Sequence, residues 1–154
     1  MNKIVKIAII VILLLFLIGG FTYFTDFNQN KTIEIGKTTF SIPENYYKGN
    51  NNNLGAINLT NGTNSLFILE HETTDLHGYL VNYTDYVQKD LNQSVKVTCS
   101  TVENSQNVYK VEKSNDTQII HYFFVRNGKT YEIYTWDGNS QTDMIVENMI
   151  KSIN

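Results

Sequence analysis

The stretch QIIHYFFVRNGKTYEIYTW, Gln118–Trp136, holds two runs of β-branched and aromatic residues on either side of Asn127-Gly128. Asn-Gly is the dipeptide that most favours a two-residue type I′ turn, because both central residues of that turn need positive φ. We therefore predict a β-hairpin in which Gln118–Arg126 pairs with Lys129–Trp136.

This hairpin register sorts the side chains by face, because alternate residues of a strand point to opposite sides of the sheet. One face carries the pairs Phe124–Tyr131, Tyr122–Ile133 and Ile120–Thr135. The other carries Phe123–Glu132, His121–Tyr134 and Ile119–Trp136. Both faces are apolar enough to need cover, so we expect helices or loops on both sides. The alternative is that Phe123, Tyr134 and Trp136 form an exposed aromatic platform, which would be the candidate binding surface.

Further strands are predicted upstream by alternation and by turn signals. Thr32–Ile35 and Thr38–Ile42 flank Gly36-Lys37, which would place Ile33 opposite Phe40. Leu54–Thr60 and Thr63–Glu70 flank a type I′ signal at Asn61-Gly62. Val95–Glu103 and Val108–Lys113 are two further strand candidates. Runs of hairpins predict an antiparallel sheet.

Two segments have helical spacing instead. In Leu76–Leu91 the apolar residues recur three and four apart, and Thr74 or Asp75 could cap the first turn. The last helix is expected to begin near Gln141, with Ser140 and Asp143 as a capping box and a stripe formed by Val146, Met149, Ile150 and Ile153. The predicted fold class is α+β, an antiparallel sheet covered by two helices in an α/β/α sandwich.

The N-terminus differs from the rest of the chain. Lys3 and Lys6 precede an apolar run, Ile7–Phe24, whose length falls within the roughly 17–25 residues of a membrane-spanning helix. The positive-inside rule then places residues 1–6 in the cytoplasm. We predict a signal anchor at 7–24, a short linker at 25–31 and an extracytoplasmic domain at 32–154, so that one partner of the chain is the lipid bilayer.

A cleaved signal peptide is the alternative for this segment. Its cleavage site would need small residues in an A-x-A pattern, and the candidates around Gly19 and Gly20 match that pattern poorly. Both interpretations place the domain outside the cytoplasmic membrane. We favour the uncleaved, single-pass anchor.

The composition argues against nucleic-acid binding and against an internal disulfide. The chain has a formal net charge of −3, and Lys3 and Lys6 precede the apolar run, so the domain itself is more acidic. Nucleic-acid binding needs a basic surface and is not expected. Cys99 is the only cysteine, so no internal disulfide can form, and we expect it to be a small buried apolar residue. Export makes glycosylation possible at six N-x-S/T sequons, at Asn30, Asn58, Asn61, Asn82, Asn92 and Asn115.

Potential ligand atoms are densest between the second hairpin and the first helix. His71, Glu72, Asp75 and His77 could in principle hold zinc, but no H-E-x-x-H spacing is present. We therefore predict no metal site, with these four as weak candidates, and no cofactor. No nucleophile elbow, P-loop or dinucleotide fingerprint occurs. The chain is thus not expected to be an enzyme.

The order of elements resembles that of PsbP-like domains over Lys31–Asn154. Many of these domains open with F-x-x-P and an aromatic residue, as in Phe40-Ser41-Ile42-Pro43 followed by Tyr46, where many members carry Trp. The ending is also similar, with Tyr131-Glu132-Ile133 before a terminal helix that contains Met149–Ile153. The resemblance implies an antiparallel sheet between helices and a non-enzymatic accessory or binding role. Similar small anchored domains occur in low-GC prokaryotes, including methanogenic archaea.

Together these features predict a membrane-anchored extracytoplasmic binding or accessory module without catalytic activity, whose partner would be an envelope protein or a surface polymer. The alternative is a cell-envelope hydrolase or metal-binding protein that uses His71 and His77, or His121. The alternative requires these histidines to converge in one place with carboxylates.

Overall fold

The computed structural model describes residues 31–52, 54–102, 106–114 and 119–153. Thr32–Asn154 forms one unit with its own core. The predicted basic terminus at 1–6, the anchor at 7–24 and the linker up to residue 30 lie outside the described residues. Within the described ranges, no helix is long and apolar enough to cross a membrane.

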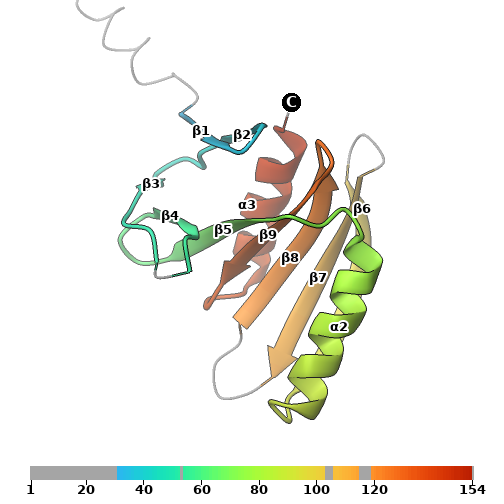
Figure 1. The fold of residues 1–154 in the computed structure, drawn as a ribbon. Coiled ribbons are helices and arrows are strands. Elements are labelled where there is room, and N and C mark those ends of the chain that lie inside the picture. Colours follow the sequence, from blue (N-terminus) through green and yellow to red (C-terminus); the bar gives the residue numbers. More distant parts are fainter. Residues whose placement is uncertain (1–30, 53, 103–105, 115–118, 154) are drawn as a thin grey trace, which may run out of the picture. The chain divides into compact units, whose positions relative to one another are not determined.

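A seven-stranded antiparallel sheet forms the centre of this unit (Figure 1). Its strands lie in the order β3 (Tyr47–Lys48), β4 (Ile57–Thr60), β5 (Ser65–His71), β9 (Lys129–Thr135), β8 (Ile119–Arg126), β7 (Gln106–Ser114) and β6 (Ser94–Val102). A separate hairpin is made by β1 (Thr32–Ile35) and β2 (Thr38–Ser41), with Ile33 opposite Phe40 as predicted.

The Asn127-Gly128 turn is confirmed together with its register. Both residues have positive φ, 51° and 73°, as a type I′ turn requires. Phe124 lies opposite Tyr131 and Phe123 lies opposite Glu132. Because Thr130, Glu132 and Tyr134 share one face of β9, the turn determines which side of the sheet each of these side chains reaches.

Two details of the first half of the sheet differ from the prediction. The β4–β5 connection is a four-residue loop rather than a type I′ turn at Asn61-Gly62, since Thr60 pairs with Ser65. The Asn61 side chain accepts hydrogen bonds from the backbone N–H groups of Thr63 and Asn64, at 3.0 and 2.7 Å, and so favours the wider loop. The short strand β3 was not predicted, because two residues carry no periodic signal.

Helix α3 (Ser140–Lys151) covers one face of the sheet, and the β1–β2 hairpin packs into the same core. The predicted apolar stripe is buried, with residues 0 to 4% exposed: Val146, Met149, Ile150 and Ile153. The predicted cap is wrong by one residue. Asn139 is the N-cap, and its side chain accepts from the N–H groups of Gln141 and Thr142, whereas Ser140 is already helical.

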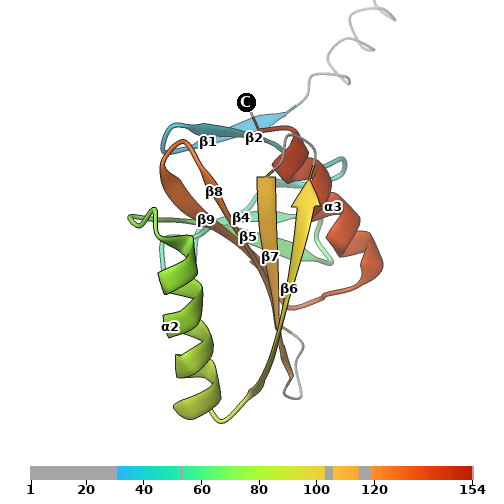
Figure 2. The same cartoon turned by 90° about the vertical axis from the view of Figure 1, so that its right-hand side faces the viewer.

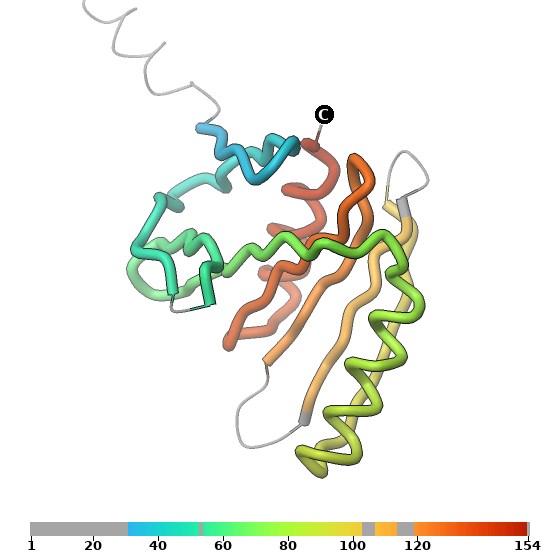
Figure 3. Tube along the Cα trace, in the orientation of Figure 1, coloured from blue at the N-terminus to red at the C-terminus, as the bar shows by residue number. Residues whose placement is uncertain are grey.

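Helix α2 (Leu76–Lys89) covers the other face, so that the sheet lies between two helices (Figure 2). Asp75 caps it by accepting a hydrogen bond from the N–H of Gly78 at 3.0 Å. Figure 3 shows the chain crossing from β5 to α2 at the end of the sheet where β8 and β9 turn. The carbonyl of Thr73 accepts from the N–H of Thr130 at this crossing, which fixes the start of α2 beside β9.

Cys99 lies in the edge strand β6 and is exposed, so the prediction that it is buried was wrong. Periodicity placed it in a strand correctly. Burial, however, depends on whether another strand or a helix covers that part of the sheet, and alternation along one strand does not reveal this.

We expect the core beneath α3 to carry much of the stability. Phe124 is fully buried, and its replacement by Ala should lower the free energy of unfolding by about 3–5 kcal/mol, because a cavity replaces the ring. Tyr86→Ala, at a position 51% exposed on α2, should change it by only about 0.5 kcal/mol. Urea denaturation of both variants checks this. Equal losses in the free energy of unfolding from the two variants would show that Phe124 is not in the core.

Candidate functional site: the sheet face beside α2

A buried carboxylate lies on the face of the sheet that α2 covers. Glu132, in the middle of β9, is 5% exposed. Its Oε2 accepts a hydrogen bond from Nε2 of His71 at 2.8 Å, and its Oε1 accepts one from Nδ1 of His121. Burying a carboxylate is costly unless it is paired and hydrogen-bonded. The two imidazoles therefore allow Glu132 to occupy this place.

The sheet register brings these three side chains together. Glu132 lies opposite Leu69 on β5 and opposite Phe123 on β8. His71 comes two residues after Leu69 and His121 two residues before Phe123, each on the same face as Glu132, so both are diagonal neighbours of Glu132. Diagonal pairs lie within reach of long and aromatic side chains. The convergence is thus a consequence of two antiparallel registers.

The protonation pattern follows from this burial. Burial alone would raise the pKa of the Glu132 carboxyl, but the hydrogen bonds and charges of His121 and His71 outweigh it and lower the pKa to about 2. Burial lowers the pKa of the His121 imidazole, with Glu132 opposing the change. An ionised carboxylate can only accept hydrogen bonds. The Nδ1 proton of His121 therefore lies toward Glu132, which leaves Nε2 as an acceptor.

Two tyrosines of α2 complete this group. The hydroxyl of Tyr83 lies 3.0 Å from Nε2 of His121 and is placed to donate to it. The ring of Tyr79 packs on that of His71 with centroids 4.8 Å apart, and Lys113 lies over the Tyr83 ring. We call Glu132, His71, His121, Tyr79 and Tyr83 the His–Glu cluster. It joins α2 to the sheet through polar contacts as well as apolar ones.

The hydrogen bonds run from a hydroxyl to an imidazole to a carboxylate, through Tyr83, His121 and Glu132. Nucleophilic triads have the same order of groups. The electrostatics favour a structural role. Burial and then the negative charge of Glu132 raise the pKa of the Tyr83 hydroxyl. A hydroxyl that holds its proton more firmly than a free tyrosine is a poor nucleophile at neutral pH.

An aromatic group lies next to this cluster, at the far end of β9. The ring of Trp136 packs edge-on against the rings of Phe67 and Tyr134, with centroid distances of 4.7 and 5.5 Å. Tyr134 stacks on Phe67, and its hydroxyl accepts from Nδ2 of Asn52 at 2.6 Å. Trp136 nevertheless keeps 50% of its surface exposed. We call Trp136, with Phe67 and Tyr134 supporting it, the Trp136 surface.

The structure separates the three residues of the predicted aromatic platform. Phe123 is fully buried and Tyr134 is 6% exposed, so neither is free to bind a partner. Phe123 lies under α2 against Leu76 and Leu80, which explains its burial. Trp136 remains accessible because it follows the last paired residue of β9, Thr135.

The four weak metal candidates are not brought together. His71 bonds to Glu132, and Asp75 caps α2. Glu72 forms an ion pair with Lys129, and His77 is exposed on α2. Within the described residues, no group of three or more His, Cys, Asp or Glu side chains is arranged so that it could hold a metal ion.

The sequons differ in how accessible they are. Asn61, Asn82 and Asn92 are exposed, whereas Asn58 is half-buried in β4. Asn30 and Asn115 lie outside the described residues. Three of the six are therefore placed where a glycan could be attached, and their modification stays a prediction.

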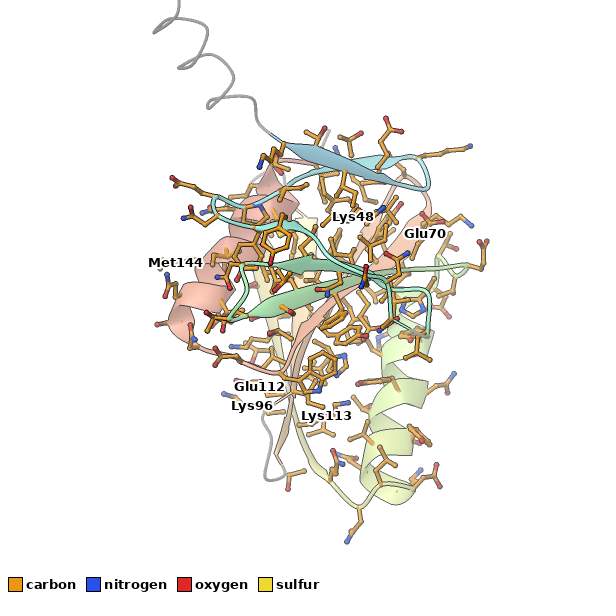
Figure 4. All side chains as sticks on the ribbon, turned by 90° about the vertical axis from the view of Figure 1, so that its left-hand side faces the viewer. Lys48, Glu70, Lys96, Glu112, Lys113 and Met144 are labelled. Carbon is orange, nitrogen blue, oxygen red and sulfur yellow. The ribbon has the colours of Figure 1, made fainter. Side chains whose placement is uncertain are left out.

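A cavity of about 290 Å³ lies on the opposite face, between α3 and the strands β6 to β8. Figure 4 shows Lys96 and Glu112 pointing to this side and Lys113 pointing toward α2. The two lysines and two of the acids that line it pair with one another, Lys96 with Glu112 at 3.2 Å and Lys110 with Asp143 at 2.9 Å. These charges are thus largely compensated within the protein.

Comparison with known proteins supports the fold. The chain is similar to the solution structure of cyanobacterial PsbP (CyanoP) from Synechocystis sp. PCC 6803, with a TM-score of 0.51 and 12% sequence identity. The match covers 80% of this chain and 91% of the cyanobacterial one. No protein-family model and no curated protein sequence matches. The chain therefore has a PsbP-like fold, as the sequence resemblance predicted.

Glu132→Gln tests the His–Glu cluster. We expect it to lower the free energy of unfolding at neutral pH by about 1–3 kcal/mol, because both imidazoles lose a charged acceptor. The pKa of Glu132 is about 2 in the folded state and near 4.5 in the unfolded chain, so the unfolded chain takes up the proton first. The stabilisation that Glu132 gives the wild-type fold is thus present above pH 4.5 and lost as the pH falls toward 2.

Urea unfolding at several pH values between neutrality and about 3 measures this difference. Glu132→Gln should lose less stability than the wild type below pH 4.5. Glu72→Gln is the matched control, because that side chain is 88% exposed and should leave the pH dependence unchanged. Identical acid sensitivity in Glu132→Gln and in the wild type would contradict the assignment.

Proposed function

We propose that this chain is a membrane-anchored extracytoplasmic binding module without catalytic activity, and that it binds its partner at the Trp136 surface. The observation that carries the proposal is the half-exposed indole, supported from below by two buried rings. Exposed tryptophans on rigid supports are frequent anchors of protein interfaces, because they bury a large area at little cost in conformational entropy. The partner class is an envelope protein or a surface polymer.

The anchor makes a small binding surface effective. Residues 7–24 would hold the domain close to the outer face of the membrane through the linker at 25–31. Confinement near a membrane raises the effective concentration of partners in the same layer. The composition of the chain, rich in Asn, Ile and Lys, fits a low-GC prokaryotic source, and the methanogenic archaea are one such group.

Site-directed photocross-linking tests the binding surface. A photoreactive benzoylphenylalanine at Trp136 in the full chain, expressed in its native membrane, should cross-link to a discrete partner. Benzoylphenylalanine in place of Tyr86 is the matched control, because Trp136 and Tyr86 are 50% and 51% exposed. Equal products from both positions, or none from position 136 in folded protein, would refute the Trp136 surface.

The alternative of a cell-envelope hydrolase draws on one observation, the order of Tyr83, His121 and Glu132. His71 also converges on this carboxylate, but His77 does not. The raised pKa of Tyr83 gives catalysis less support than binding. A metal-binding role that uses His71 and His77 is weaker still, because Glu132 already engages His71.

Tyr83→Phe separates these alternatives. If Tyr83 were a nucleophile, its removal would reduce hydrolysis of a simple ester by roughly 10³-fold or more. We expect no such hydrolysis in the wild type. The variant should lose only about 1 kcal/mol of stability, because His121 Nε2 loses its hydrogen-bond donor. Ester turnover in the wild type that disappears in Tyr83→Phe would establish the hydrolase instead.

A further inference from the structure

Strand β6 forms one edge of the seven-stranded sheet, and in the described part of the chain its strand partner is β7. It is nine residues long, whereas β3 at the other edge has only two. Seven of the eight residues from Ser94 to Thr101 are exposed, and Val95 is half-buried. A long edge strand presents a row of backbone donors and acceptors that can pair with another chain.

The usual protections of an edge strand are weak here. The β6–β7 register runs through nine consecutive pairs without a bulge, and β6 contains no proline. Its only charged residue is Lys96, which forms an ion pair with Glu112 on β7 at 3.2 Å. Val97 is 47% exposed, and the exposed Cys99 lies on the same face of the strand. Natural edges that avoid pairing carry charges, bulges or proline instead.

We propose that β6 pairs with β6 of a second copy of this chain, antiparallel, with Ser94 opposite the second copy's Val102. This register is the only one that pairs all nine residues of both strands. It places Thr98 opposite its own counterpart on a two-fold axis, which gives a closed, isologous dimer. The dimer would extend the sheet across both copies. This surface is separate from the Trp136 surface and does not depend on it.

The side chains of β6 are self-complementary in this register. Val97 would lie opposite the second copy's Cys99, and the symmetry repeats that contact, so four apolar side chains meet on one face. Lys96 would lie opposite the second copy's Ser100, so no like charges are directly opposed. Apolar cross-strand pairs stabilise a sheet, and opposed like charges destabilise it. The sequence of β6 thus accommodates a copy of itself.

The register makes a specific prediction for the thiols. Cys99 and its counterpart would be diagonal neighbours, about 7–8 Å apart, with their Cβ atoms somewhat closer. Because Cys99 is the only cysteine, a short bismaleimide can join two chains only at this position. Treatment of the full chain in membrane vesicles should give a dimer-sized product, and Cys99→Ser should abolish it.

Two valines of equal exposure provide the matched test. Val97 on β6 and Val81 on α2 are 47% and 48% exposed. Val97→Lys should weaken association roughly tenfold, because two apolar pairs are lost and two charges are introduced by symmetry. Val81→Lys should leave the cross-linked fraction unchanged. Circular dichroism checks that both variants are folded.

A further control separates edge pairing from crowding in the membrane. The double variant Cys99→Ser, Val81→Cys carries its thiol on α2 and should not cross-link. Three results would overturn the proposal: no dimer from the folded wild type, equal dimer from Val97→Lys and Val81→Lys, or equal cross-linking from position 81. A product containing another protein in place of a second copy would also overturn it.

Discussion

The two-residue turn at Asn127-Gly128 is the constraint on which the rest of the structure depends. A shift of one residue in a β-hairpin would exchange the two faces of each strand. With this turn, Tyr131 and Ile133 enter the core beneath α3, while Glu132 and Tyr134 face the side of α2. The same alternation directs Trp136 to the α2 side, one residue beyond the last pair of β9.

A polar residue in the middle of an otherwise apolar hairpin then determines how that second face is organised. Glu132 is buried, so it needs hydrogen-bond donors, and side chains on the two neighbouring strands supply them. His71 and His121 do so, and Tyr83 extends the chain of hydrogen bonds to α2. A network of this kind holds a helix in one position on a sheet more specifically than apolar contacts do. Tyr134, one of the two supporting rings of the Trp136 surface, stacks on the His121 ring of this network with centroids 5.5 Å apart.

The sequence predicts most elements and the β8–β9 register well, but it predicts the β4–β5 register and the exposed surfaces poorly. The Asn-Gly hairpin, the two helices and the cover on both faces follow from local patterns that the structure repeats. The exposure of Cys99 and the burial of Phe123 depend on which strand lies at the edge and which part of the sheet α2 covers. Glu132 was missed as a site residue, although its predicted register already placed it beside His121. The signal was a charged residue in a strand whose two faces were both expected to be covered.

The most direct test of this account uses the fluorescence of the single tryptophan. The register of β8 and β9 places Trp136 half in contact with Phe67 and Tyr134 and half in water. Acrylamide should therefore quench its emission in the folded chain to a degree between that of a buried indole and that of the urea-unfolded chain. Emission that acrylamide cannot quench in the folded chain would place Trp136 in the core and contradict the proposed binding surface.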